Sequence, residues 1–254
     1  MQRKQIPHNI ETKRGTIVGD FFYDADQFGE NIQTGKNRVV IVSHGFGSCA
    51  QWNMGTVDAL VEEGYLVYVF DFLFGGPQSR SNPDTTKMTV LSEVEDLNDI
   101  IDNLKALPFI DSEEILPLGE SQGGVVTALT AAQRDDLKKI VLYYPAFCLR
   151  DDGLKMFDGD LENCPNIVKV LDLEIGREYY EAVWDIDLYE EAAKYEGRVR
   201  IIHGTKDGLV PYACSEKLVT MYKHADLFPM EGADHGYGGE DIYKAAKLVK
   251  EFFE

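Results

Sequence analysis

The sequence predicts an α/β protein built on a mostly parallel β-sheet. Short runs rich in β-branched and aromatic residues alternate with longer amphipathic runs along the 254 residues, which is typical of parallel strands joined by crossover helices. Several short runs are almost continuously apolar, as expected for strands covered on both faces. The pentapeptide Gly119–Gly123 (GESQG) lies between an apolar run and a segment of helical character. This strand–turn–helix context gives the G-x-S-x-G pattern its meaning.

The apolar runs predict the strands in chain order. They are Thr16–Phe22, Val39–Ser43, Leu66–Phe70, Ile115–Leu118, Ile140–Tyr144, Val199–His203 and Asp226–Met230. Pro117 lies within one of them, and proline removes a backbone donor from the ladder. We therefore expect either that this strand is locally irregular or that its boundary lies elsewhere.

The amphipathic runs predict the helices Gln51–Glu63, Thr89–Leu107, Gln122–Arg134, Tyr212–Tyr222 and Asp241–Phe253. The second has the clearest pattern, because its apolar residues recur every three or four positions and line one face. These residues are Val90, Val94, Leu97, Ile101 and Leu104.

One stretch interrupts the alternation. Residues 146–196 contain turns rich in Gly, Pro and Asp, followed by a predicted helical segment at Glu178–Lys194 that is rich in Tyr and Trp. The stretch is too long for a crossover and too apolar for a linker. We predict a core formed by residues 1–145 and 197–254, with a lid inserted over the carboxyl edge of the sheet. A surface elaboration that only packs is the alternative.

Composition limits the partners. The net charge of −19 argues against nucleic acid and anionic membranes, because no basic stripe is present. The chain shows neither a signal peptide nor an apolar run of membrane-spanning length. Its four cysteines form no C-x-x-C motif and no Cys/His cluster. We therefore predict a cytoplasmic protein with reduced thiols and with neither a metal nor a cofactor.

Three residues on separate loops predict nucleophilic catalysis. Ser121 is at the centre of the Gly-flanked turn, Asp207 follows the strand Val199–His203, and His235 follows the strand that ends at Met230. A serine needs a base to take its proton, and the base needs an orienting carboxylate. The order Ser…Asp…His is that of G-x-S-x-G hydrolases. Each residue alone would be an ordinary turn or surface residue.

Other polar residues lie near these three in the sequence. Asp234 precedes His235, but neighbours in sequence rarely point at each other's ring. His203 is expected to form local hydrogen bonds, and Glu120 is expected to point away from the reaction.

The segment His44–Gly47 follows a strand, and its glycines allow a backbone N–H to approach a substrate oxygen. We predict that the oxyanion donors are the N–H groups of Phe46 and Gln122.

These motifs carry a family resemblance. The segments His44–Gly47 (HGFG), Met88–Asp96 (MTVLSEVED), Gly119–Val126 (GESQGGVV), Ile202–Asp207 (IHGTKD) and Glu231–His235 (EGADH) resemble the α/β-hydrolase superfamily. Within it, the sequence from about residue 38 onward is most similar to bacterial cinnamoyl and feruloyl esterases. The resemblance implies an eight-stranded, mostly parallel sheet, a small lid, no metal and the triad and donors named above. It is also compatible with a homodimer.

The resemblance further implies a serine esterase acting on a small aryl or short-chain acyl ester. The lid residues Asp151, Asp152 and Tyr179 fall near the positions that hold a phenolic hydroxyl in feruloyl esterases, and Trp184 would add to an apolar wall. The lid length and the segment Leu73–Ser79 (LFGGPQS) depart from the pattern. A thioesterase, an amidase or a peptidase could use the same triad, and a non-catalytic ligand-binding protein is the alternative from another class.

Overall fold

The fold was analysed in a computed structural model, which describes residues 1–33 and 35–254. Its main sheet has eight strands within these residues, as the sequence resemblance implied. They are β1 (Arg3–Pro7), β4 (Gly19–Asp24), β5 (Asn37–Ser43), β6 (Leu66–Phe70), β7 (Ile110–Glu120), β8 (Lys139–Tyr143), β11 (Arg198–Gly204) and β12 (Ala225–Met230).

The strand order in this sheet is β1-β4-β6-β5-β7-β8-β11-β12. The strands from β6 to β12 are parallel, whereas β4 pairs antiparallel with both β6 and β1. The sequence reading missed β1, an edge strand of mixed polarity whose side chains are exposed or half-buried. It also merged β4 with the short β3 (Gly15–Ile17), which pairs with β2 (Ile10–Thr12).

Pro117 lies inside β7, opposite Ile41 of β5. The pairing between β7 and β8 begins only at Leu118, one residue after the proline. The register between β5 and β7 also shifts near the start of both strands. The register with β5 is continuous through Pro117 itself, and β7 extends beyond the predicted strand at both ends, so the predicted boundary was wrong.

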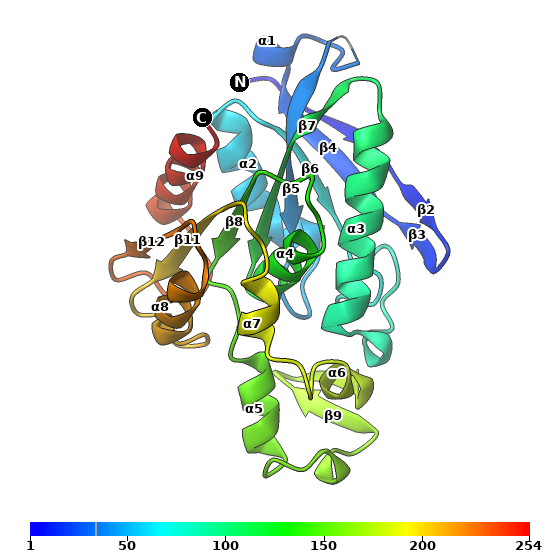
Figure 1. The fold of residues 1–254 in the computed structure, drawn as a ribbon. Coiled ribbons are helices and arrows are strands. Elements are labelled where there is room, and N and C mark those ends of the chain that lie inside the picture. The colour runs from blue at the N-terminus through cyan, green and yellow to red at the C-terminus, as the bar shows by residue number, and fades with distance from the viewer. Residues whose placement is uncertain (34) are drawn as a thin grey trace.

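Helices cover both faces of the sheet (Figure 1). They are α1 (Ala25–Phe28), α2 (Met54–Glu62), α3 (Val90–Ala106), α4 (Gln122–Ala132), α5 (Leu149–Met156), α6 (Glu178–Glu181), α7 (Leu188–Ala192), α8 (Tyr212–Met221) and α9 (Glu240–Phe253), with short 3₁₀ turns η1 (Ala50–Asn53), η2 (Thr85–Lys87) and η3 (Leu161–Asn163). On one face α2 packs against α9, and on the other α3 packs against α4. The predicted helix Gln51–Glu63 is thus η1 followed by α2.

Part of the region 146–196 lies at the lower end of the molecule in Figure 1, where α5, β9 (Ile167–Val170) and α6 are labelled, whereas α7 lies higher, next to the core. The region contains α5 and the hairpin of β9 and β10 (Leu173–Gly176), neither of which was predicted. The hairpin turns at Leu171 and Asp172, both with positive φ. Because neither residue is a glycine, the sequence lacks the usual signal for such a turn.

The predicted helix at Glu178–Lys194 was wrong as a single element. It is two short helices, α6 and α7, and α7 packs against α4 of the core. Asp187 begins α7, because its carboxylate accepts the backbone N–H groups of Tyr189 and Glu190 at 3.0 and 3.1 Å. An aspartate in this role favours a new helix start over continuation of the previous helix.

Candidate active site

Ser121 occupies the sharp turn between β7 and α4. Its backbone has φ 55° and ψ −118°, a conformation that side chains rarely adopt and that costs free energy. Backbone bonds hold it there: the Ser121 N–H donates to the Tyr143 carbonyl at 2.9 Å, and its own carbonyl accepts the Ala146 N–H at 3.1 Å. The central strands β7 and β8 thus fix the serine at the carboxyl edge of the sheet.

The glycines around the serine are required by space. A Cβ atom on Gly119 would lie 2.1 Å from the Gly123 carbonyl oxygen, and one on Gly123 would lie 2.4 Å from the Ser43 carbonyl oxygen. Both distances are far below van der Waals contact. The G-x-S-x-G pattern is therefore a steric condition for placing β5, β7 and α4 this close together.

Asp207 and His235 meet at the same edge, from the loops after β11 and β12. The His235 Nδ1 lies 2.8 Å from Asp207 Oδ2. The other oxygen, Oδ1, accepts the backbone N–H groups of Leu209 and Val210 at 2.9 and 2.8 Å. The Asp207 side chain is fully buried, whereas that of His235 is 20% exposed. A buried, fully bonded carboxylate can fix the tautomer of the imidazole and stabilise its protonated form.

The rival carboxylate does not reach the ring. Asp234 Oδ1 accepts the backbone N–H groups of His235 and Gly208 at 2.7 and 2.9 Å. These bonds hold the loop after β12 against the loop after β11. The Asp234 carboxylate therefore bonds backbone groups and not the ring of its neighbour His235.

His203 is a second imidazole on Asp207. Its Nε2 lies 3.1 Å from both Asp207 Oδ2 and the Val210 carbonyl oxygen, and its Nδ1 lies 2.7 Å from Ser215 Oγ. Because both neighbours of Nε2 are acceptors, Nε2 carries the proton and Nδ1 accepts the serine hydroxyl. Burial lowers the pKa of His203. Its local bonds were predicted, but its contact with the carboxylate of Asp207 was not.

The Ser121 hydroxyl and the His235 ring share no hydrogen bond within residues 1–33 and 35–254. Tyr144 contacts the His235 ring and the side chain of the residue that precedes the serine. The Tyr144 ring packs edge-on against the His235 ring, with centroids 4.7 Å apart, and its hydroxyl donates to Glu120 Oε2 at 2.9 Å. Glu120 immediately precedes the serine. Catalytic hydrogen bonds in unliganded sites are often long and tighten only with substrate present.

Glu120 does not line the cavity at Ser121. Its Oε1 accepts the Thr56 hydroxyl at 2.5 Å, so the side chain is turned toward α2. Burial raises the pKa of Glu120. The placement agrees with a side chain directed away from the reaction, although through Tyr144 it also supports the imidazole.

The turn around Phe46 and the start of α4 at Gln122 leave the backbone N–H groups of both predicted oxyanion donors without a local acceptor among the described residues. The Ser48 N–H donates to the Gly45 carbonyl at 3.2 Å, which closes a turn with Phe46 and Gly47 at its corners. A corner residue such as Phe46 does not use its N–H in such a turn. Gln122 is the first residue of α4, where an N–H has no acceptor within the helix. A Cβ on Gly45 would lie 3.0 Å from Ser121 Cβ, so this loop passes directly over the serine.

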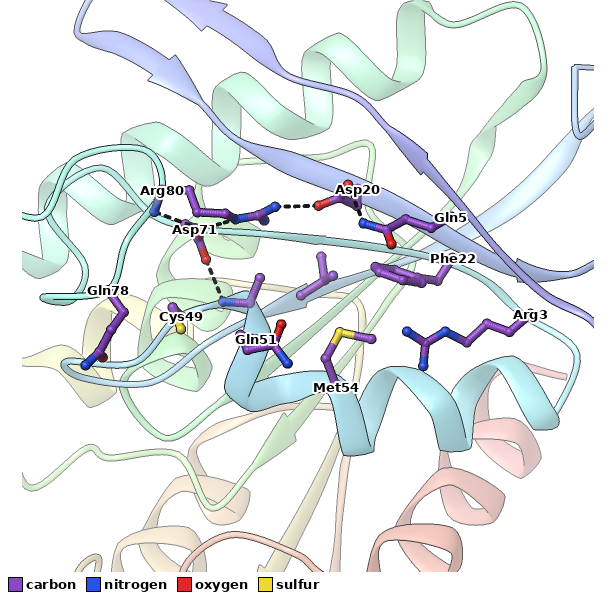
Figure 2. Close-up of a pocket in the computed structure, with 12 residues that line it drawn as sticks. Arg3, Gln5, Asp20, Phe22, Cys49, Gln51, Met54, Asp71, Gln78 and Arg80 are labelled. Carbon is purple, nitrogen blue, oxygen red and sulfur yellow. Dashed lines mark hydrogen bonds and ion pairs between the residues drawn. The ribbon is translucent and has the colours of Figure 1, made fainter.

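A polar network at the end of β6 holds the start of η1, which follows the loop that contains Phe46 (Figure 2). Asp71, at the end of β6, accepts the Ala50 N–H at 2.6 Å and the Arg80 Nε at 2.7 Å. Arg80 extends to Asp20 at 2.7 Å. This network borders a pocket that also contains Arg3 and Gln51 and that Ser121 does not line. The charged groups of this network bond to one another and to the backbone, so we assign them a structural role in bracing the Phe46 loop.

His44 also braces this loop. The Phe72 N–H donates to its Nε2 at 3.1 Å, and its Nδ1 lies 2.9 Å from the Gly45 carbonyl oxygen. The ring is therefore neutral with its proton on Nδ1, and burial lowers the pKa of His44. A neutral, fully bonded ring has no capacity left to act as a second base.

A cleft opens in front of the serine. Both predicted oxyanion residues line it, together with Asp152 and Tyr179 of the lid. Its enclosed volume is about 110 Å³, which is smaller than the roughly 300–1,000 Å³ of small-molecule sites in general. Asp151 and Trp184, the other two predicted contacts, are not among its lining residues: Asp151 pairs with Arg150 at 3.9 Å, and the Trp184 carbonyl accepts Arg150 Nε at 2.8 Å.

Behind the cleft lies a bond network that the sequence argument did not identify. The Gln122 amide donates from Nε2 to Glu93 Oε2 at 2.8 Å, and its Oε1 accepts the Tyr179 hydroxyl at 2.6 Å. The Tyr179 ring packs edge-on against Phe46, with centroids 5.7 Å apart. The only sequence signal was a glutamate on the apolar side of α3, within the segment Met88–Asp96 that carries the family resemblance.

Two further observations concern metals and membranes. Within the described residues, the acidic, histidine and cysteine side chains form no group suited to hold a metal ion. None of the helices in that part of the chain has both the length and the apolar character needed to cross a bilayer.

Known proteins resemble this chain in sequence and in fold. Residues 51–254 match the prolyl oligopeptidase family. The AB hydrolase superfamily protein YisY of Bacillus subtilis is 23% identical over 203 residues, which cover 62% of this chain and 73% of YisY. Est1E from Butyrivibrio proteoclasticus, solved with ferulic acid bound, has a TM-score of 0.84 at 23% identity, covering 96% of this chain and 97% of that one.

The esterase Pf2001 of Pyrococcus furiosus has a TM-score of 0.67 at 19% identity, with 98% of this chain and 92% of that chain covered. At these identities the solved structures establish the fold, whereas the family match spans most of the sequence. The chain therefore belongs to the prolyl oligopeptidase family and is a serine hydrolase of the α/β-hydrolase fold.

Proposed function

We propose that the protein is a carboxylic ester hydrolase in which Ser121, His235 and Asp207 form the catalytic triad. The observation that carries this proposal is the His235–Asp207 pair, 2.8 Å apart, at the sheet edge where the strained Ser121 faces an open cleft. An imidazole fixed by a carboxylate and a serine open to a cleft, at the same edge of the sheet, are the groups that acyl transfer requires.

The mechanism follows from the positions of these groups. His235 takes the hydroxyl proton as Ser121 attacks the ester carbonyl. The N–H groups of Phe46 and Gln122 hold the resulting oxyanion, and each such donor contributes on the order of 3 kcal/mol. His235 then protonates the leaving alcohol, and water attacks the acyl-enzyme by the same path to release the acid. Asp207 stabilises the imidazolium in both halves.

For the acyl group we propose an aryl acid of the cinnamoyl or feruloyl type, with short acyl chains also accepted. Phe46, Tyr179 and Tyr180 give the cleft aromatic walls, and Asp152 adds a carboxylate to its lining. The Tyr179 hydroxyl donates to Gln122, so its oxygen offers lone pairs to the cleft. A substrate hydroxyl would donate its single proton to one of these two acceptors, the Tyr179 oxygen or the Asp152 carboxylate. Ferulic acid bound to Est1E supports an aryl acid by analogy of fold.

The first test is hydrolysis of p-nitrophenyl esters by the wild type and by Ser121→Ala. We expect turnover by the wild type and a loss of at least about 10³-fold in the variant. Ser112→Ala, on the same strand β7 but away from the turn, is the matched control and should keep full activity. A fluorophosphonate probe should label the wild type and not Ser121→Ala. Retained turnover in Ser121→Ala would refute the assignment, and a wild type that binds aryl acids without turnover or labelling would favour a ligand-binding protein.

The family match makes peptide cleavage a second candidate. The same acyl-enzyme chemistry serves esters, thioesters and amides, so a matched panel of aryl esters, thioesters and prolyl p-nitroanilides separates them. We expect the aryl esters to give the highest kcat/KM. A preference for the prolyl amides would replace the esterase proposal with a peptidase.

A further inference from the structure

Glu93 is an acidic side chain with no place in the triad chemistry. It lies on α3, is fully buried, and has one identified partner, the Gln122 amide. Its second oxygen, Oε1, has no hydrogen-bond partner within residues 1–33 and 35–254. A buried acid with an unsatisfied oxygen is costly for stability, so its presence beside the nucleophile turn calls for a functional reason.

The bonds around Glu93 have a defined direction. Glu93 accepts from Gln122 Nε2, which leaves Gln122 Oε1 facing the lid as an acceptor for the Tyr179 hydroxyl. Gln122 is itself almost fully buried and follows Ser121 directly. Three side chains from α3, α4 and α6 thus form one continuous chain of hydrogen bonds from the core to the lid.

This chain ends on the wall of the cleft. Tyr179 lines the cleft and packs against Phe46, whose N–H is a proposed oxyanion donor. Among the described contacts, the Tyr179–Gln122 bond is a direct polar link between the lid and the residue beside the nucleophile. Loss of the Glu93 acceptor would free the Gln122 amide to rotate, and the lid tyrosine would then lose its fixed partner.

We propose that Glu93 is a positioning residue, which through the Gln122 amide holds Tyr179 of the lid in place and so shapes the acyl side of the cleft. Its role in selectivity rests on the proposed esterase function, but its hold on the lid does not. The role is one of orientation: Glu93 touches neither the substrate nor the reacting atoms. An acyl group long enough to reach Tyr179 depends on Glu93, whereas an acetyl group does not.

The test compares three variants on the same helix. Glu93→Leu removes the acceptor, Glu93→Gln keeps an acceptor oxygen for Gln122, and Glu95→Gln changes an exposed glutamate two residues away. Hydrogen exchange of the lid segment 173–184 is measured first, because it requires no activity. We expect Glu93→Leu to speed exchange there by about tenfold, since a buried donor is left unpaired. The other two variants should match the wild type within about twofold.

Kinetics with paired substrates then test selectivity. The kcat/KM of Glu93→Leu should fall by about tenfold for p-nitrophenyl cinnamate and by less than about threefold for p-nitrophenyl acetate. Glu93→Gln should restore both values. Combining Glu93→Leu with Tyr179→Phe should cost little more than either change alone, because both break the same chain.

Unchanged lid exchange in a folded Glu93→Leu, or equal losses for both esters, would overturn the proposal. A Glu93→Gln variant as impaired as Glu93→Leu would do the same. If the wild type hydrolyses neither ester, the esterase function fails by itself, and lid exchange still decides whether Glu93 holds the lid.

Discussion

His203 Nε2 lies 3.1 Å from Asp207 Oδ2, the oxygen that also accepts from His235 Nδ1 at 2.8 Å. One buried carboxylate oxygen thus bonds two imidazoles, and of the two rings only that of His235 is partly exposed. We predict that replacing His203 with Phe lowers kcat by about tenfold to a hundredfold, because a hydrogen bond to a charged group contributes about 1.5–3 kcal/mol.

The measurement is the pH dependence of kcat/KM for His203→Phe, with His224→Gln as control. His224 is exposed, so its replacement should change nothing. With one donor fewer on Asp207, we expect the acid limb of the profile, which reports the catalytic base, to shift along with the fall in rate. A folded His203→Phe enzyme with an unchanged profile would show that the second imidazole is dispensable.

The glycines of the site give a graded prediction. Gly119→Ala places a Cβ 2.1 Å from a backbone oxygen, so we expect no stable protein. Gly45→Ala places one 3.0 Å from Ser121 Cβ, a contact that small shifts can relieve, so we expect folded protein with about tenfold to a hundredfold lower kcat. Gly238→Ala meets nothing within 4 Å and should behave as the wild type. Thermal melting and kcat on one ester measure the series, and a fully active Gly45→Ala would contradict it.

Tyr144 separates packing from hydrogen bonding. Tyr144→Phe keeps the ring that packs on His235 but removes the bond to Glu120. We expect a stability loss of about 1–2 kcal/mol, since Glu120 loses a buried donor, with kcat within about threefold of the wild type. Tyr144→Ala removes the ring as well, so kcat should fall further as the imidazole loses its support. Urea unfolding measures the loss of stability, and kcat measures the effect on catalysis. Equal kcat values in Tyr144→Phe and Tyr144→Ala would exclude the packing role.

Glu93 predicts a pH dependence of stability. Burial raises its pKa well above the ordinary value of 4.5. The folded state therefore keeps a proton that the unfolded chain has released, and stability is highest below the ordinary pKa and is lost as the pH rises through the folded one. Asp96 and the Tyr179 hydroxyl are the titratable groups that face it. Asp96 adds a change of the same sign, because burial raises its pKa to about 7.

The check is urea unfolding at pH 5, 7 and 9 for the wild type and Glu93→Gln. The variant should lose less stability than the wild type across this range, because its amide does not titrate. The remaining slope belongs to Asp96 and other groups. Parallel slopes for the two proteins would mean that Glu93 does not carry its proton in the folded state.

Local patterns determined much of this molecule. The central strands were predicted correctly because a strand covered on both faces needs a continuous apolar run, and such a run can be recognised in the sequence alone. Gly119 and Gly123 likewise predicted the turn at Ser121, since a turn this tight excludes side chains on both sides of the serine. The order of Ser121, Asp207 and His235 also pointed to one sheet edge, because parallel strands deliver their following loops there.

Elements without a local signature were lost. β1 is an edge strand of mixed polarity, and its identity depends on pairing with β4. The β9–β10 hairpin turns through Leu171 and Asp172 at positive φ, without the usual glycine. The prediction of a single helix at Glu178–Lys194 was wrong because Asp187 caps a new helix. An aspartate inside an amphipathic run does not by itself show whether it caps a helix or continues one.

The sequence by itself set the class of fold and nominated the nucleophile, the base and the acid, because each depends on residue type and chain order. Tertiary structure alone decided the partners: the two imidazoles on Asp207, the support of His235 by Tyr144, and the chain from Glu93 to Tyr179. These contacts join residues 24 to 91 positions apart, with the exception of the local His203 bond. Pairings at that range are fixed by how helices and loops dock on the sheet, and no local pattern encodes them.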